Sequence, residues 1–346
     1  MRLRDALLDQ AVHCEALGSP FMARLFQLLA DRLRPDAPLA ERLFSWEGDL
    51  SPSGHSVPLR LAGALHAYVL KSPDSKLAHA YPPHVVEDDV LWEAINDTLK
   101  GEAEFIDAFL NNAPQTNEVR RSAAILPAAL HVSDHFGLPL TLSELGASAG
   151  LNLNFDSYAV RINGDSYGAS NPALTLTPDW TGPPPPDAPL SISTRRGVDL
   201  NPLTGAGDAE RLRAYLWADQ PERLTLTNAA LALPLPPIDG ADAADWLEDR
   251  LSRSYGGSTH FLFHSVAWQY FPDAVQSRCE RAILAAAKRA TSAAPLAWFS
   301  METDNGAGGQ GAKLTLKLWP GEIVLDLGRA DFHGRWVNWR LGSRIC

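Results

Sequence analysis

The sequence predicts an α/β protein in which a helical amino-terminal region precedes a mainly parallel sheet. Apolar residues recur at helical spacing through much of the first third of the chain. From Leu138 onward, short apolar runs alternate with helical patterns, which is typical of parallel strands joined by helices. The first of these runs ends in a glycine-rich turn, as a buried parallel strand does.

The helical region has three segments of clear periodicity, at residues 3 to about 30, 90–110 and 119–136. The stretches between them that contain proline and glycine predict connections within one helical unit. We therefore expect a helical domain at residues 1–113, acting as a lid or substrate domain, and a second domain at residues 114–346.

The second domain begins with a predicted strand at residues 138–145. A hairpin is expected next, with strands at 158–162 and 165–167 and a two-residue turn at Asn163-Gly164. Together with the proline run at 183–186, this hairpin predicts an insertion at about 158–189.

The rest of the second domain alternates between the two kinds of pattern. Strands are expected at residues 190–194 (leading to Asp199), 260–268 and 296–301, and helices at 209–217, 243–253 and 274–290. The last two runs, 313–319 and 322–327, are joined by Pro320-Gly321 and predict an antiparallel hairpin at the sheet edge.

The charge balance favours a small-molecule partner. The 346 residues include 30 basic and 41 acidic side chains, and the resulting net charge of -11 repels nucleic acid and anionic membranes. Cys14, Cys279 and Cys346 are far apart and lack metal-ligand spacing, so we expect free thiols in a reducing compartment. No signal core or membrane span is present in the sequence, and we expect a cytoplasmic protein.

The glycine-rich turn, Glu-Leu-Gly-Ala-Ser-Ala-Gly at residues 144–150, predicts a nucleotide-like ligand. Small residues between a strand and a helix start let backbone amides approach such a ligand. Ser148 stands where the dinucleotide fingerprint needs a glycine beside the pyrophosphate, which disfavours NAD. S-adenosylmethionine has no phosphate, and Glu144 can face its cationic end. We therefore predict S-adenosylmethionine as the cofactor.

Two other functions remain open. Gly-Ala-Ser-Ala-Gly also satisfies the nucleophile-elbow pattern of α/β-hydrolases, with Ser148 as nucleophile and Asp304 and His333 following in the required order. Against a serine esterase, the preceding 140 residues look helical, and no His-Gly-Gly oxyanion loop lies upstream. The third alternative is a nucleotide- or cofactor-binding protein without transfer activity.

The region from Gln115 to the end resembles class I S-adenosylmethionine-dependent methyltransferases. More specifically, it resembles a bacterial family of unknown function whose members share five motifs. These are Pro-Gln-Thr-Asn-Glu at 114–118, Glu-Leu-Gly-Ala-Ser-Ala-Gly-Leu-Asn-Leu at 144–153, Asp-Leu-Asn-Pro at 199–202, His-Ser-Val-x-Trp-Gln-Tyr at 264–270 and His-Gly-Arg-Trp-Val at 333–337.

The resemblance implies a Rossmann-like sheet of seven strands, with His264 ending the fourth strand. Asp199 is then expected to bind ribose hydroxyls, and Asp242 to bind the adenine amino group or simply to cap a helix. The expected cofactor-binding residues are Glu144, Gly146, Ala147, Ser148, Gly150, Asn152, Asp199, Asp242, Ala243 and His264.

Methyl transfer to a small molecule requires alignment of the acceptor and, where the acceptor carries a proton, a base. We expect His264 and Glu118 as catalytic residues, with a structural histidine as the alternative for His264. The expected acceptor pocket is lined by Gln115, Asn117, Arg120, Trp268, Gln269 and Tyr270. The glycine-rich segment 305–311 predicts a mobile connection or a lid.

Overall fold

The structure is a computed structural model that describes residues 2–52 and 54–344, so Cys346 lies outside the described residues. The chain divides into two compact units. The first comprises residues 1–116 and 205–225, and the second residues 117–204 and 226–346. The segment 205–225, expected in the second domain, thus belongs to the first unit. In the described part of the chain, every helix is too short or too polar to cross a membrane.

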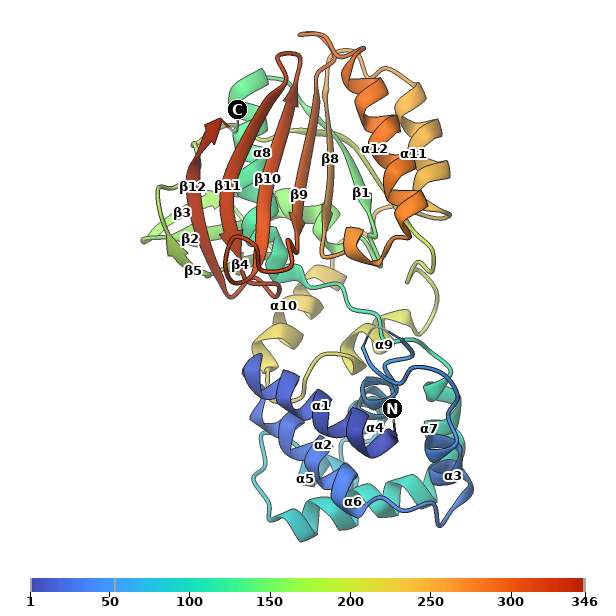
Figure 1. The fold of residues 1–346 in the computed structure, drawn as a ribbon. Helices are drawn as coiled ribbons and strands as arrows, with labels where there is room; N and C mark the ends of the chain where they lie inside the picture. The colour runs from blue at the N-terminus through green and yellow to red at the C-terminus, as the bar shows by residue number, and fades with distance from the viewer. Residues whose placement is uncertain (1, 53, 345–346) are drawn as a thin grey trace. The chain divides into compact units, whose positions relative to one another are not determined.

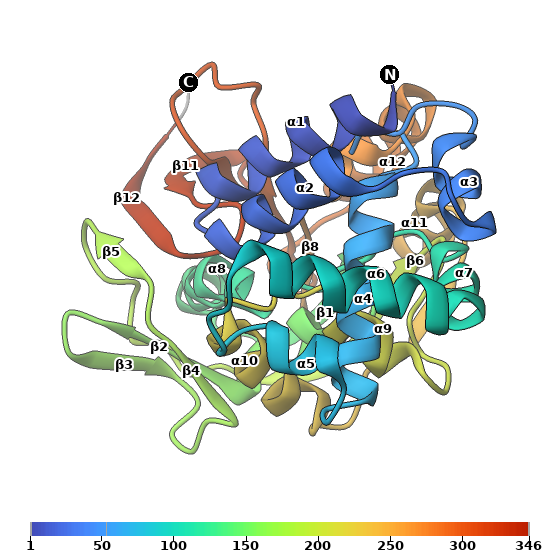
Figure 2. The same ribbon diagram turned by 90° about the horizontal axis from the view of Figure 1, so that it is seen from below.

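The first unit is helical and has its own leucine-rich core (Figure 2). Its helices are α1 (Leu3–Ala16), α2 (Pro20–Arg32), α3 (Pro38–Phe44), α4 (Val57–Lys71), α5 (Lys76–Ala80), α6 (Asp88–Gly101), α7 (Ala103–Leu110) and α9 (Asp208–Ala214). Helix α10 (Pro221–Leu231) contains the boundary between the two units.

Two expectations for the helical region need correction. The periodic stretch from residue 3 to about 30 forms two helices, because Gly18 adopts a positive φ and Pro20 starts the second helix. Helix α4 lies in a stretch that we expected to be a connection. Its Pro58 stands in the first turn of the helix, where a missing N–H breaks no helical hydrogen bond.

Residues 205–225 join the first unit through contacts that the local sequence pattern does not reveal. The carboxylate of Asp219 accepts hydrogen bonds from Ser19 Oγ at 2.5 Å and from the backbone N–H of Phe21 at 3.0 Å. The hydroxyl of Tyr215 donates to the carbonyl of Asn112 at 2.9 Å. The carboxylate of Asp219 thereby accepts a backbone N–H in the first turn of α2, whose own N-cap side chain makes no such hydrogen bond.

The second unit is built on a nine-stranded sheet (Figure 1). Its strand order is β5-β12-β11-β10-β9-β8-β1-β6-β7. The strands are β1 (Leu140–Leu145), β5 (Asp179–Thr181), β6 (Ile192–Asp199), β7 (Ile238–Gly240), β8 (Thr259–Ser265), β9 (Leu296–Glu302), β10 (Ala312–Trp319), β11 (Ile323–Ala330) and β12 (Trp336–Arg344). The five strands from β7 to β9 are parallel, and β9 to β12 pair antiparallel.

The predicted α/β class and mainly parallel sheet are confirmed, but the sheet has nine strands and not the expected seven. The carboxyl-terminal hairpin of β10 and β11 is also confirmed, although it does not form the sheet edge. Strand β12 pairs with β11, and β5 from the insertion pairs with β12. The alternation of buried Val337 and Trp339 with exposed Asn338 and Arg340 was a sequence signal for β12.

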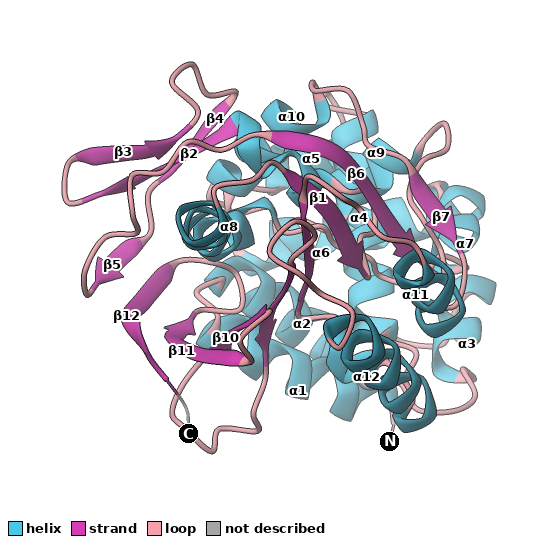
Figure 3. Ribbon diagram, turned by 90° about the horizontal axis from the view of Figure 1, so that it is seen from above, coloured by secondary structure: helices cyan, strands magenta, loops and turns pink. Residues whose placement is uncertain are grey.

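Helices cover both faces of this sheet (Figure 3). Helix α8 (Ser122–Phe136) lies on one face, and α11 (Ala243–Ser252) and α12 (Asp273–Ala287) lie on the other. The inserted segment forms a separate small sheet of β2 (Tyr158–Ile162), β3 (Asp165–Gly168) and β4 (Leu174–Leu176). Its predicted hairpin is confirmed, with positive φ at Asn163 and Gly164 as the turn requires.

Candidate functional site

The carboxyl ends of the central parallel strands bring four predicted or polar residues to one edge of the sheet. Leu145 of β1 is in register with Val198 of β6 and with His264 of β8. Glu144, Asp199, His264 and Glu302 therefore stand at or next to the ends of neighbouring strands. Ligands of open α/β sheets bind outside this edge.

The turn after β1 uses its backbone amides within the protein. Gly146 and Ala147 both donate to the carbonyl of Val198, at 2.9 and 3.0 Å. Ser148 donates its amide to the carboxylate of Asp199 at 2.9 Å, and Gly150 donates to Ala147 at 2.7 Å. These four amides stabilise the turn, so they are not available to cradle an anion.

The glycines of the turn are required by packing as well as by backbone conformation. A Cβ on Gly146 would lie 2.5 Å from the Cβ of Ala267, and Gly146 has a φ of +68°. A Cβ on Gly150, with a φ of +74°, would lie 2.6 Å from Pro236. Both positions therefore exclude a side chain because protein atoms already fill the space.

The expected helix after the turn is replaced by a 3-10 segment, η2 (Leu151–Ser157), whose backbone is interrupted at Asn154. The amide of Leu151, its first residue, donates to Asn117 Oδ1 at 2.8 Å. The positive end of an α-helix is thus missing at this place, and the sequence argument that relied on it is wrong.

Glu144 is the buried carboxyl group of this turn. Its side chain is 2% exposed, and Oε2 has no hydrogen-bond partner among the described residues. Burial raises the pKa of Glu144 well above its ordinary value, and Asp199 raises it further, while Arg121 lowers it. Ser148 Oγ is likewise buried and unpartnered among the described residues, on a backbone with a φ of +54°. Glu144 Oε2 and Ser148 Oγ are therefore two buried polar atoms of the turn without a hydrogen-bond partner among the described residues.

The two acidic residues expected at the nucleotide differ in their surroundings. Asp199 accepts the amide of Ser148 through one carboxylate oxygen and the amide of Asn201 through the other, both at 2.9 Å. Asp242 is the N-cap of α11, because its Oδ1 accepts the amides of Ala244 and Asp245. Ala243 is the buried first residue of that helix. Of the two expectations for Asp242, the structure thus agrees with the second, that Asp242 caps a helix.

His264 is held by hydrogen bonds at both ring nitrogens. Nε2 lies 3.0 Å from Trp298 Nε1, and Nδ1 lies 2.8 Å from Glu302 Oε1. The indole N–H only donates, so Nε2 is the acceptor and the proton of a neutral ring is on Nδ1. His264 is thus fixed between Trp298 and Glu302, and its expected catalytic role remains a prediction.

Glu302 receives three hydrogen bonds on one oxygen. Oε1 accepts the Nδ1–H of His264, the amide of Ala267 at 3.0 Å and the amide of Trp268 at 3.2 Å. Burial raises the pKa of Glu302, but these hydrogen bonds outweigh burial and lower the pKa below its ordinary value. Oε2 is buried and has no partner among the described residues. The group is thus an ionised carboxylate with one oxygen unused.

The segment that follows β8 makes a tight turn beside Glu302. Val266 has a φ of +51°, a strained conformation for a β-branched residue. The ring of Trp268 stacks on His264 with centroids 4.8 Å apart, and Trp268 is half-buried. Gln269 and Tyr270 are exposed, and both belong to the short 3-10 segment η3 (Trp268–Tyr270). Of the predicted acceptor residues, Trp268 is therefore the one that the structure packs against His264.

Asn117 and Glu118, the last two residues of the motif at 114–118, lie at the end of the glycine turn. Asn117 is buried and accepts the amide of Leu151, as described above. Glu118 is buried, and its Oε1 accepts the amide and the Nε–H of Arg120, at 3.2 and 3.3 Å. Asn152 Nδ2 donates to the carbonyl of Glu118. Gln115 belongs to the first unit.

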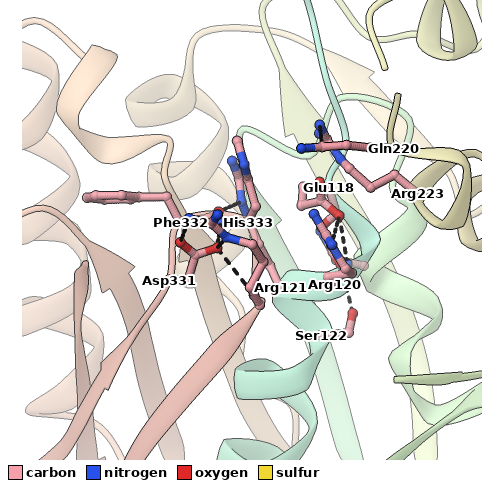
Figure 4. Close-up of polar contacts among 11 residues, drawn as sticks. Glu118, Arg120, Arg121, Ser122, Gln220, Arg223, Asp331, Phe332 and His333 are labelled. Atoms are coloured by element: carbon pink, nitrogen blue, oxygen red, sulfur yellow. Dashed lines mark hydrogen bonds and ion pairs between the residues drawn. The ribbon is translucent and has the colours of Figure 1, made fainter. Parts of the chain in front are cut away.

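Arg121 connects three of these segments, as Figure 4 shows in part. Its Nε donates to the carbonyl of Phe332 at 3.0 Å, and its Nη1 donates to the carbonyl of Ser265 at 2.9 Å. Gly334 packs against the backbone of Arg120, where a Cβ would lie 2.3 Å from the carbonyl oxygen. We did not predict a role for Arg121, although its place directly after the polar motif was the available signal.

Contacts link all five sequence motifs at this edge of the sheet. Asn117 accepts the amide of Leu151, and Ser148 donates its amide to Asp199. Arg121 donates to the carbonyls of Ser265, at the end of β8, and of Phe332, next to His333. The motifs are far apart in the sequence, so their convergence is a property of the fold. It makes this edge the candidate functional site.

The serine hydrolase alternative lacks its expected hydrogen bonds. Ser148 Oγ is unpartnered among the described residues. Asp304 binds Arg329 through both carboxylate oxygens at 2.8 Å, and the ion pair lowers the pKa of Asp304. Arg329 also donates to the carbonyls of Gly309, Gln310 and Gly311. The glycine-rich loop is therefore anchored by Arg329 in the structure, and Asp304 serves that anchor.

Comparison with known families supports the bacterial resemblance. Residues 4–339 match a family of uncharacterized proteins conserved in bacteria (DUF2332). The chain belongs to this family. The match covers both units, so the helical first unit is part of the family's common architecture. Among curated proteins, no sequence matches the chain.

Proposed function

We propose that this protein binds S-adenosylmethionine at the carboxyl edge of its parallel sheet and transfers the methyl group to a small molecule. The order of the parallel strands, β7-β6-β1-β8-β9, supports this proposal, because the first strand of the chain is the central one of the five. In such sheets the ligand lies where the chain reverses its direction of strand addition, here between β1 and β8.

The observation that carries this proposal is the unpartnered, buried carboxyl oxygen of Glu144. A buried polar group without a partner destabilises a protein by roughly 1–3 kcal/mol, so a ligand that supplies the partner is favoured. The neighbouring amides are already used, and the turn therefore offers little to a phosphate. A ligand with N–H donors and positive charge suits this turn better than a dinucleotide does.

The residues present agree with S-adenosylmethionine in part. Glu144 would hold the methionine portion beside the turn that carries Ser148, and Asp199 stands at the strand end from which ribose hydroxyls are bound. When bound, S-adenosylmethionine supplies an activated methyl group on a positively charged sulfur. Asp242 is committed to capping α11, so adenine recognition is assigned to other groups of the site.

Binding can be tested by thermal denaturation with S-adenosylmethionine, S-adenosylhomocysteine and NAD. We expect the first two ligands to stabilise the protein, by about 2.7 kcal/mol at a hundredfold excess over Kd, and NAD not to do so. Glu144→Gln should selectively weaken S-adenosylmethionine, because the uncharged side chain cannot pair with the sulfonium. Stabilisation by NAD alone, or by none of the three, would contradict the proposal.

The pH dependence gives a second readout that does not require turnover. A cationic ligand favours the ionised form of Glu144, whose pKa is raised in the free protein. The affinity for S-adenosylmethionine should therefore increase with pH relative to that for S-adenosylhomocysteine, which lacks the sulfonium charge. Calorimetric titration at several pH values measures this ratio, and a ratio independent of pH in the wild type would refute the role of Glu144.

A further inference from the structure

Glu302 has no arginine or lysine partner among the described residues, and its nearest basic group is the imidazole of His264, whose Nδ1 lies 2.8 Å from Oε1. Its hydrogen-bond donors are two backbone amides and the Nδ1–H of His264. The indole N–H of Trp298 lies at Nε2 of His264, so Nδ1 is the ring nitrogen that donates to Glu302. Other carboxylates of this unit are paired differently: Asp304 binds the guanidinium of Arg329, and Asp331 binds that of Arg335.

The unused oxygen of Glu302 has surroundings that suit a cation. Oε2 of Glu302 is buried. Trp268, whose amide binds Oε1, is half-buried, so the carboxylate lies near solvent. The rings of Trp268 and Trp298 lie 5.8 Å apart beside His264. A carboxylate next to aromatic rings attracts ammonium and guanidinium groups through charge-assisted hydrogen bonds and cation–π contacts.

We propose that Glu302 recognises a positively charged nitrogen group, an ammonium or guanidinium, on the small molecule that enters this site. Two features carry the proposal: the buried, unpartnered Oε2, and the three donors to Oε1, none of which is an ammonium or guanidinium group. Oε2 has no donor among the described residues, and a cationic nitrogen group would supply one of opposite charge. The strained Val266 is consistent with this assignment, because its positive φ lies in the turn whose next two amides, those of Ala267 and Trp268, bind Oε1.

This role of Glu302 deepens the proposed function, because it defines the chemical class of the methyl acceptor. It rests on the proposed function only in that the bound molecule is called a methyl acceptor. A nitrogen that Glu302 holds as a cation has no lone pair for an incoming methyl group. The methylated atom is therefore a different atom of the same molecule. Glu302 then determines specificity and orientation, and His264 and Trp298 act as positioning residues through it.

The test uses the full chain labelled with 15N-tryptophan, titrated with butylammonium chloride and with 1-butanol as the uncharged probe of similar size. The indole resonance of Trp298, assigned with Trp298→Phe, reports the hydrogen bond to His264 next to Glu302. We expect a saturable shift with butylammonium and none with butanol at the same concentration. An equal response to both probes would overturn the inference without any variant.

Glu302→Gln should weaken butylammonium binding by about tenfold or more, because a neutral amide replaces a charge-assisted contact. The matched control is Asp273→Asn, which removes one charge from an exposed residue and should leave the affinity unchanged. Unchanged affinity in Glu302→Gln would refute the proposal. If Glu302→Gln does not fold, Glu302→Asp keeps the charge but retracts it, and the same loss of affinity is expected.

The same samples separate this inference from the proposed function. Binding of butylammonium without any binding of S-adenosylhomocysteine would support the role of Glu302 and refute the methyltransferase proposal. Binding of S-adenosylhomocysteine without a butylammonium response would do the reverse.

Discussion

Glu144, which is 2% exposed, and Glu302, whose side chain is 13% exposed, both stand at the carboxyl ends of parallel strands, yet their pKa values shift in opposite directions. Burial raises the pKa of Glu144 well above its ordinary value. Partial burial also raises the pKa of Glu302, but the interaction with His264 and the two amide hydrogen bonds to Oε1 lower it below its ordinary value. The comparison shows that the hydrogen-bond donors supplied by the surrounding loop, and not burial by itself, decide which carboxyl group is ionised.

The difference comes first from His264, which lies beside Glu302, and then from how the two turns use their amides. After β8, the positive φ of Val266 is followed by two amides, those of Ala267 and Trp268, that bind Glu302. After β1, the amide of Ser148 binds Asp199, and the amide of Gly146 binds a carbonyl. Glu144 therefore receives none of these donors, although it lies nearest to them in the sequence.

The largest expected effect is on the turn beside Glu144. Gly146→Ala combines a positive φ with a Cβ 2.5 Å from Ala267, and we expect it to lower the free energy of unfolding by about 3 kcal/mol. Gly137→Ala is the control, since Gly137 has a similar φ of +64° and no neighbour within 4 Å of a Cβ. It should cost only about 1 kcal/mol. Urea denaturation compares the two, and equal losses would contradict the packing argument.

Glu302→Gln tests the ionised member of the pair. We expect a loss of about 2 kcal/mol at neutral pH, because a neutral amide accepts the three hydrogen bonds more weakly. The folded-state pKa of Glu302 is lowered, so its stabilisation is present above the unfolded-state pKa of about 4.3 and is lost as pH falls through the folded-state value. Urea denaturation from pH 3 to 7 should show the wild type and variant converging in acid. If the difference in unfolding free energy between wild type and variant increased in acid, the expected direction of this pH dependence would be wrong.

Glu144→Gln should give the opposite pH dependence. The folded-state pKa is raised, so the wild type has full relative stability below the unfolded-state pKa of about 4.3 and loses it as pH rises through the folded-state value. The variant does not lose stability in this way, because the glutamine side chain does not ionise. We expect the variant to gain on the order of 1 kcal/mol relative to wild type at alkaline pH, measured by the same denaturation series. A constant difference from pH 5 to 9 would contradict this expectation.

The smallest effect is expected for Ser148→Ala. The hydroxyl is buried without a described partner, so its removal should change the free energy of unfolding by less than about 0.5 kcal/mol. Cofactor binding should also remain nearly intact. Mass spectrometry after treatment with a fluorophosphonate probe provides the control for the alternative function, because covalent labelling of Ser148 would favour a serine hydrolase.

Much of the architecture could be predicted because it depends on local periodicity. The alternation of strands and helices after Leu138, the hairpin around Asn163-Gly164 and the final antiparallel hairpin all follow from patterns within a few residues. Helix α4 and strand β12 were missed, since Pro58 and the motif at 333–337 suggested a connection and a corner. The assignment of residues 205–225 depends on contacts with residues about 200 positions away, such as Ser19 with Asp219.

The sequence by itself determined the α/β class, the glycine-rich turn and the polar residues that end the strands. Only the tertiary structure decided what those residues do. Ser148 meets Asp199 across 51 positions, and His264 meets Glu302 across 38. The charge of a buried carboxyl group depends on which donors reach it in space, and these come from other strands and loops. For that reason the sequence could indicate where these polar residues lie along the strands, while the fold determined that His264 contacts both Trp298 and Glu302.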